Sequence, residues 1–152
     1  MTEIKPPDGA KRRFVFKVFR SNGGHLIAPN GSRRPLLKRD GSWSKCHSDG
    51  PLLMCENGIH GWTTWERTDV HANYPFSVED GVKLLYLYEL ADLGRKGRAL
   101  DGKCVARYGR VVMRFKPLAS GSYGWDDIVS QFKKKFPNGK IRANNPSRGY
   151  RS

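Results

Sequence analysis

Basic side chains carry the clearest chemical signal in this sequence, because they are gathered at its two ends. Residues 1–45 contain 11 Lys and Arg against 3 Asp and Glu, residues 46–94 contain 2 against 8, and residues 95–152 contain 15 against 3. Like charges that are held together repel one another in a folded protein, so this segregation favours an anionic partner that relieves the repulsion. The alternative is that folding interleaves the segments and dilutes the asymmetry.

The types of basic and aromatic residues at the C-terminal end suit nucleic acid. Arginine binds phosphate through two parallel hydrogen bonds, and tyrosine offers a ring on which a base can stack. The sequence IRANNPSRGYRS combines both residue types. We expect phosphate contacts with little reading of base edges, on DNA or RNA, alone or in a nucleoprotein. An acidic surface of a host protein is the alternative partner. The predicted contact residues are Arg12, Arg13, Arg33, Arg34, Arg39, Lys133, Lys134, Arg142, Arg148, Tyr150 and Arg151.

A second group of residues surrounds His60, in the sequence CENGIHGWTT that begins at Cys55. A histidine beside a tryptophan can act as acid, base or hydrogen-bond donor in a pocket near neutral pH. A structural histidine bonded to a backbone carbonyl is the commoner case, and the sequence has no Ser-His-Asp order, phosphate-binding loop or dinucleotide fingerprint. A non-enzymatic role is therefore favoured. The enzyme alternative is a pocket that takes a nicotinamide dinucleotide (NAD), lined by Arg20, His60, Trp62 and Glu89.

A metal site is a further alternative, since Cys46, Cys55 and His60 are ligands that zinc accepts. Their spacing lacks the tight Cys-x-x-Cys pair of common zinc modules, so free cysteines and no cofactor are expected. The odd number of cysteines, three, indicates a reducing compartment rather than a disulfide framework. The absence of an apolar leader or a long apolar run favours a soluble, cytoplasmic protein without membrane contact.

The elements that must position these residues are mainly strands. Residues 13–20 are rich in aromatic and β-branched side chains, with Lys17 as an exception among apolar residues on both faces, which predicts a central strand. Residues 25–28 predict a short partner strand. Residues 82–90 and 103–115 predict two further strands, paired antiparallel, with Gly109 at a bulge or bend.

Helical periodicity is clearest over residues 124–136, where apolar side chains recur at positions 125, 128, 129, 132 and 136. We expect Ser122 to cap this helix, with aspartates in its first turn and lysines in its last. A weaker pattern predicts a short helix over 64–74, capped by Thr63 or Thr64.

These elements define one α+β domain, mostly antiparallel β-sheet with one amphipathic C-terminal helix and a basic tail. The expected organisation is a flexible leader over residues 1–10, the domain over 11–137 and the tail over 138–152. A long surface loop is expected over 31–49.

The Cys-x-x-Gly-Ile-His element from Cys55 to His60, followed by YLYELADLG and KCVARYGRVVMRF, resembles a group of uncharacterised bacterial and phage proteins. The resemblance covers roughly residues 14–116, although those proteins carry an aromatic residue where this chain has Ile59. It implies a phage or prophage accessory protein that acts in the bacterial host cytoplasm, and it implies no mechanism.

A weaker similarity links Phe19-Arg20 and the sequence GIHGWTT, which begins at Gly58, to ADP-ribosyltransferase-like folds. In those enzymes such elements line a nicotinamide pocket. The catalytic acid that precedes a late strand in that family has no counterpart here, which argues against an active transferase. The alternative that the resemblance implies is an ADP-ribosyltransferase-like enzyme or a degenerate pocket protein.

Overall fold

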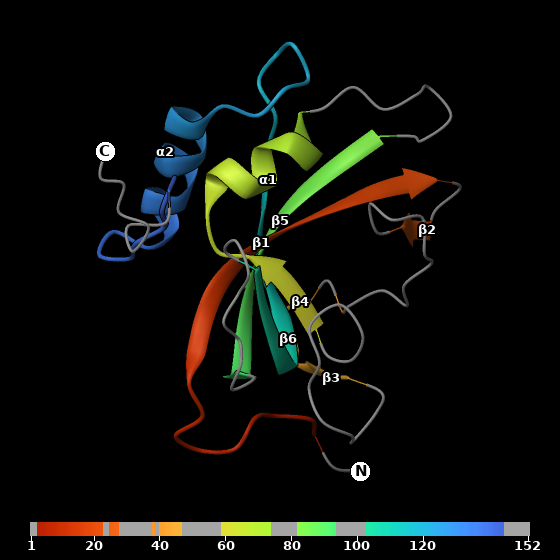
Figure 1. Ribbon diagram of the computed structural model, residues 1–152, viewed down its shortest axis with the longest axis vertical. Helices are drawn as coiled ribbons and strands as arrows, with labels where there is room; N and C mark the ends of the chain where they lie inside the picture. Colours follow the sequence, from red (N-terminus) through yellow and green to blue (C-terminus); the bar gives the residue numbers. More distant parts are fainter. Residues whose placement is uncertain are drawn as a thin grey trace.

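The computed structural model describes residues 3–22, 25–27, 38, 40–46, 59–73, 82–93 and 103–144. These residues form six strands and two helices (Figure 1), and the α+β class predicted from the sequence is confirmed. No helix in this part of the chain combines the length and apolar character needed to cross a membrane. In chain order the elements are β1 (Arg12–Asn22), β2 (His25–Ile27), β3 (Ser44–Lys45), β4 (Ile59–Trp62), α1 (Trp65–Ala72), β5 (Val82–Leu93), β6 (Lys103–Phe115) and α2 (Trp125–Lys135).

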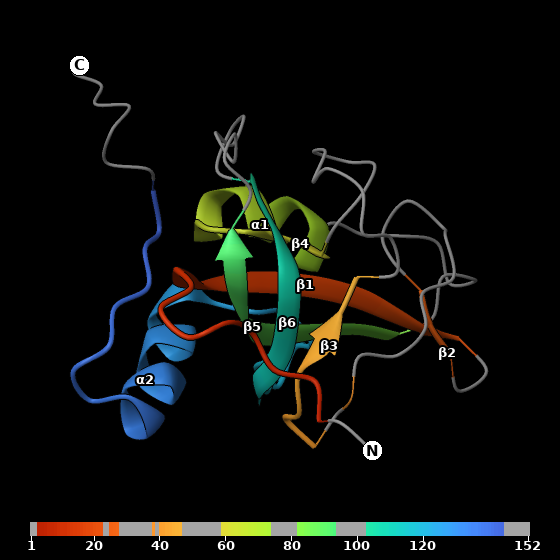
Figure 2. The same cartoon turned by 90° about the horizontal axis from the view of Figure 1, so that it is seen from below.

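Four of the strands pair in a closed antiparallel ring. β1 pairs with β5, β5 with β6, β6 with β4, and β4 returns to β1 through the pair Phe16–Trp62. The short strand β2 pairs with a part of the β1 edge that β4 does not cover. The short strand β3 pairs in the same way with a part of the β6 edge. The strands are strongly coiled, so that β1 runs across the view in Figure 2 while β6 and the arrowhead end of β5 stand upright. A register shift between Leu87 and Tyr88 adds local twist to the β5–β6 pair.

The expected bulge at Gly109 is wrong, because this residue pairs in regular register with Ser44 on one side and Leu90 on the other. A Cβ atom there would lie 3.1 Å from Ile59 Cγ2 and 3.2 Å from Leu90 Cδ2. Glycine at this position therefore permits close packing of neighbouring strands rather than a bend.

Each face of the ring has its own core, as the alternation along β1 predicts. Phe16 and Val18 of β1 lie in the cluster that both helices cover. Val15 and Phe19 lie in the other cluster, against Tyr88 and further side chains of β5 and β6. The predicted central position of β1 is confirmed, since it is paired along both edges.

The predicted C-terminal helix is confirmed as α2, which buries Ile128 and Phe132 and carries acidic residues in its first turn and lysines in its last. Its N-cap is Gly124 and not the expected Ser122, and no side chain caps it. Ser122 instead precedes the helix and shares a 2.8 Å hydrogen bond with the hydroxyl of Ser120. The aspartates of the first turn favour this end of the helix through its dipole.

The N-terminus of α1 is completed by the segment that follows α2. Trp65 N donates to Arg142 O at 2.9 Å, and Glu66 N donates to Ala143 O at 2.8 Å. Thr64 is the N-cap, but its side chain makes no capping bond, and its buried Oγ1 has no hydrogen-bond partner among the residues that the structure describes. Two of the amide groups that a helix leaves unpaired are thus satisfied by a segment nearly eighty residues away in sequence. Residues 141–143, expected in a tail, pack against the domain.

The C-terminus of α1 is fixed by Asn73 to Tyr123, the residue before the N-cap of α2. Asn73 Oδ1 accepts a 2.7 Å hydrogen bond from Tyr123 N, and Asn73 Nδ2 donates to Tyr123 O at 2.8 Å. We expect Asn73→Ala to destabilise the protein by about 2 kcal/mol, because two backbone groups lose their partners. Urea unfolding of this variant beside Asn138→Ala, an exposed site expected to change stability by less than about 0.5 kcal/mol, measures the effect. Equal midpoints for the two variants would contradict it.

Candidate nucleic-acid interface

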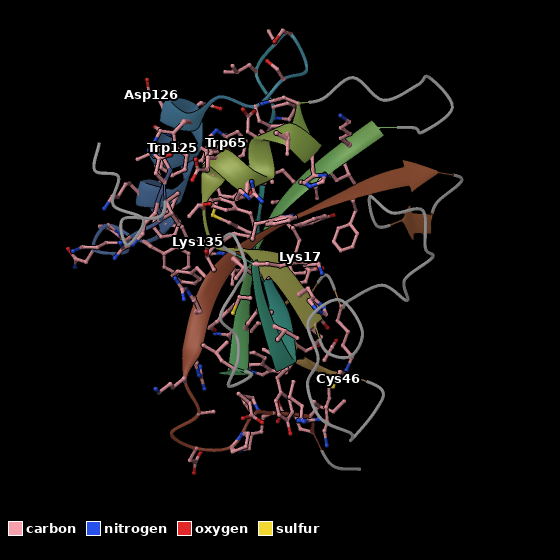
Figure 3. The ribbon with its side chains drawn as sticks, viewed as in Figure 1. Lys17, Cys46, Trp65, Trp125, Asp126 and Lys135 are labelled. Atoms are coloured by element: carbon pink, nitrogen blue, oxygen red, sulfur yellow. The ribbon has the colours of Figure 1, made fainter. Side chains whose placement is uncertain are left out.

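The C-terminal end of α2 carries three consecutive exposed lysines. Lys133 Nζ donates to Gly139 O at 2.7 Å, and Lys135 Nζ donates to Val112 O at 2.8 Å. Within the described residues, Lys134 forms no hydrogen bond or ion pair. Asp126 and Lys135 mark the opposite ends of the helix in Figure 3. The carboxylates of the first turn lie about seven residues, or roughly 10 Å, from these lysines along the axis.

After α2 the chain turns back along the helix (Figure 2). Lys140 follows the turn at the C-terminal end of α2, whereas Arg142 lies toward the other end, because its carbonyl accepts from Trp65 N and the ring of Trp65 stacks on that of Trp125. The turn is tight, because a Cβ atom on Gly139 would lie 2.7 Å from Phe132 Cζ. Ile141 and Ala143 pack against the core. Lys140, which precedes them, and Arg142, which lies between them, are exposed. The carbonyl of Arg142 accepts a hydrogen bond from Trp65 N of α1, which fixes the backbone from which the Arg142 side chain extends.

The start of β1 lies against the same end of α2. The ring of Phe14 packs on Phe132 and Phe136, with centroids 5.7 and 5.1 Å apart. Arg12 and Arg13 precede Phe14 directly and are exposed. Three stretches far apart in sequence therefore contribute exposed cations around α2, from its C-terminal lysines along the return segment toward α1, and we call this set the α2 basic surface. Its residues are Arg12, Arg13, Lys133, Lys134, Lys140 and Arg142.

A tryptophan that the sequence analysis missed lies beside Arg12. Trp43 is 9% exposed, with the guanidinium carbons of Arg110 and Arg12 lying 4.7 and 5.3 Å from its ring centroid. Glu89 binds Arg110 through Nη2 at 2.7 Å and Nε at 2.9 Å, and its contact with Arg12 is longer, at 3.9 Å. One carboxylate thus faces two arginines. The sequence feature that could have identified Trp43 is its place in a segment rich in Gly and Ser.

Few carboxylates oppose the basic residues in this part of the molecule. Residues 103–144 contain ten Lys and Arg against two aspartates. In the described ranges, Arg13, Lys134, Lys140 and Arg142 form no ion pair, whereas Arg12, Arg107 and Arg110 do. The basic residues are therefore not neutralised one by one. Of the other predicted contacts, Arg33, Arg34, Arg39, Arg148, Tyr150 and Arg151 lie outside the described residues.

The four residues of the alternative pocket do not share one site. Arg20 is opposite Lys83 in the β1–β5 pair, whereas Glu89 is opposite Phe14, six positions further along β5. Six strand positions correspond to about 20 Å. Glu89 is engaged by arginines at that far end. The register thus places Arg20 and Glu89 of the alternative NAD-binding pocket too far apart to line one site.

His60 lies in β4, where its backbone carbonyl accepts a 2.6 Å hydrogen bond from Lys17 Nζ. This ammonium also lies 5.5 Å from the ring centroid of Phe19 and 5.6 Å from that of Tyr88. Lys17 lies on the face of β1 that carries Val15 and Phe19, and its side chain reaches the backbone of β4 (Figure 3). The bond joins two strands of the ring, which is a structural role.

Two of the three zinc ligands suggested by the sequence, Cys46 and His60, are described, and the described residues contain no group of three His, Cys, Asp or Glu side chains suited to a metal. Cys46 lies near Arg107, with Nη1 3.8 Å from its sulfur atom, and Cys55 is outside the described ranges. Cys104 is buried, and burial raises the pKa of its thiol, which keeps it protonated and unreactive.

Comparisons of the chain with protein-family models, with curated proteins and with solved structures found no match. The class of the protein therefore follows from its own fold and surface: an α+β domain built on a closed antiparallel ring, with exposed cations gathered beside its C-terminal helix.

Proposed function

We propose that this protein binds nucleic acid through phosphate contacts made by the α2 basic surface. The observation that carries the proposal is the gathering around α2 of exposed cations from β1, α2 and the return segment, of which Lys134, Lys140 and Arg142 form no ion pair within the described residues. Arginine and lysine side chains in such a group neutralise successive phosphates without reading base edges. DNA, RNA and a nucleoprotein all present phosphate groups to such a surface.

Helix stability alone does not account for this arrangement. Lysines in the last turn of a helix are favoured by its dipole, which explains Lys133 and Lys134 in part. The effect falls off beyond that turn and does not act on Arg13, Lys140 or Arg142. These cations repel one another in the free protein, and a polyanion offsets that repulsion.

The resemblance of the Cys55–His60 element supports a phage or prophage accessory protein that acts in a bacterial cytoplasm. This origin fits a small basic protein whose partner is host or phage nucleic acid. The role is binding rather than catalysis, since the residues of the alternative pocket lie apart.

Binding to random single- and double-stranded oligonucleotides across a salt series tests the proposal. If about six phosphates are neutralised, the logarithm of affinity for duplex should fall with the logarithm of salt with a slope near −5. Fluorescence anisotropy between about 50 and 200 mM salt gives this slope directly. Affinity that is independent of salt, or no binding at the lowest salt, would refute the proposal and favour an acidic protein surface as the partner.

Lys134→Glu is the sharpest single variant, because Lys134 has no contact among the described residues whose loss would disturb the fold. We expect its affinity to fall roughly fivefold to tenfold at low salt, with a salt slope shallower by about 1. Lys5→Glu changes the net charge equally at an exposed site outside the α2 basic surface. Its affinity should change less than about twofold if position, and not net charge, governs binding.

A further inference from the structure

A second group of cations surrounds an aromatic stack between β4 and α1. The rings of Trp62 and His71 are 5.3 Å apart and nearly parallel, at 20°. Lys103 Nζ lies 5.3 Å from the Trp62 centroid and Arg67 Cζ lies 6.0 Å from it. Trp62 and His71 are half-buried, so a ligand can reach the edge of the stack.

The local fold fixes this arrangement. Arg67 and His71 are four residues apart on α1 and therefore share a face of the helix. Lys103 is the direct cross-strand partner of Trp62 in the β4–β6 pair. Together with Lys83 at the start of β5, these residues come from four elements.

The electrostatic field at His71 is positive. Burial lowers the pKa of its imidazole, and the charges of Lys103, Arg67 and Lys83 lower it further. Asp69, the nearest acid on the same helix, is hydrogen-bonded by Asn73 Nδ2. The imidazole is therefore neutral near pH 7, and protonating it adds a charge next to three others.

We propose that Arg67, Lys83 and Lys103 hold a phosphodiester group of bound nucleic acid beside the Trp62–His71 stack, and that His71 takes up a proton when it binds. This inference rests on the proposed function and adds a second, proton-linked contact to it. A phosphodiester among the three cations offsets their repulsion of the imidazolium, which favours the protonated form. By reciprocity, protonation of His71 tightens binding of the phosphodiester.

The sign of the pH dependence follows from this linkage. Neither the phosphodiesters nor the thymines of (dT)20 titrate between pH 5.5 and 8, so any pH dependence of its binding comes from the protein. We expect wild-type affinity for (dT)20, measured at constant low salt, to rise roughly threefold to tenfold as the pH falls from 8 to 5.5. His71→Gln keeps a planar polar side chain on Trp62 but cannot be protonated, and its affinity should stay level over the same range.

A second measurement, of the His71 pKa, is made on the wild-type protein and uses a variant only to assign the NMR signals. The imidazole proton signals of wild-type protein, assigned by comparison with His71→Gln, report the pKa of His71 by NMR titration. This pKa should rise when (dT)20 is added. Lys5→Ala and Lys103→Ala remove one charge each, and only Lys103→Ala should weaken both binding and its pH dependence.

Each outcome decides between the proposals. Binding that is independent of pH, an equal pH dependence in His71→Gln, or an unchanged His71 pKa on adding (dT)20 overturns this inference and leaves the proposed function standing. No binding of (dT)20 at any pH at low salt overturns this inference, and no binding of duplex as well overturns both.

Discussion

Gly61→Ala is expected to destabilise the protein by about 3 kcal/mol or more, enough to unfold a domain of ordinary stability under mild conditions. A Cβ atom at this position would lie 2.3 Å from Val15 Cγ2, 2.6 Å from Val15 Cβ and 3.2 Å from Phe16 O. The first two atoms belong to a fully buried side chain and the third to the backbone, so none can move aside cheaply.

The site of the substitution magnifies its effect. β4 meets β1 through one residue pair, Phe16–Trp62, directly beside Gly61. A methyl group there pushes the two strands apart at the point where the ring closes. We therefore expect loss of a closed structure and not a local adjustment, with a lower urea midpoint and faster amide exchange in β4.

Gly124→Ala is the matched control, since its added Cβ meets the exposed Leu118 side chain, with Cδ1 at 3.3 Å. Its cost should stay within about 1 kcal/mol, the usual range at an N-cap. A double-mutant cycle with Val15→Ala isolates the steric term. Gly61→Ala should cost less when Val15 is already Ala, and an equal cost in both backgrounds would show that the contact with Val15 is not the cause.

Truncation after Lys140 should lower the free energy of unfolding by about 3–5 kcal/mol, because the removed residues are part of the fold. Ile141 and Ala143 leave the core that both helices cover, and Trp65 N and Glu66 N lose their acceptors at the start of α1. Thermal or urea unfolding followed by circular dichroism measures the loss. A stability equal to that of the full chain would contradict the capping role of residues 142 and 143.

Truncation after Asn144 separates stability from binding. It keeps every contact just described and removes Arg148 and Arg151. We expect unfolding to change by less than about 0.5 kcal/mol, while the salt slope on duplex becomes shallower by up to about 2 if both arginines contact phosphate. An unchanged slope would confine binding to the α2 basic surface and exclude these two arginines.

Local patterns predicted most of the elements, because each depends on neighbours in sequence. The alternation from Phe14 to Phe19 indicated a two-faced central strand, and the apolar stripe from Trp125 to Phe136 indicated the amphipathic helix. The ring could not be predicted, since its closure depends on a single pair between strands about forty-five residues apart. The cap of α1 by Arg142 and Ala143 is equally non-local and carries no sequence signature.

The same distinction applies to the candidate site. Net charge by segment identified Arg12, Arg13, Lys133, Lys134 and Arg142, which come from three stretches of sequence that the fold places around α2. Sequence proximity of His60 and Trp62 suggested a pocket, but the partner of the Trp62 ring is His71 on α1, and His60 serves β4 through its backbone. The environment of Trp43 was missed because Arg12 and Arg110 meet it only through tertiary packing.

The pairing pattern of the long strands also bears on how this protein behaves when many copies gather on one polymer. β5 is paired on both sides, and β1 is bordered by β5 on one side and by β4 and β2 on the other. Exposed backbone edges are what allow neighbouring molecules to add strands to each other and aggregate. Crowding along a nucleic acid would thus offer neighbouring molecules no free edge of β5, so we expect dense coating to remain reversible on adding salt.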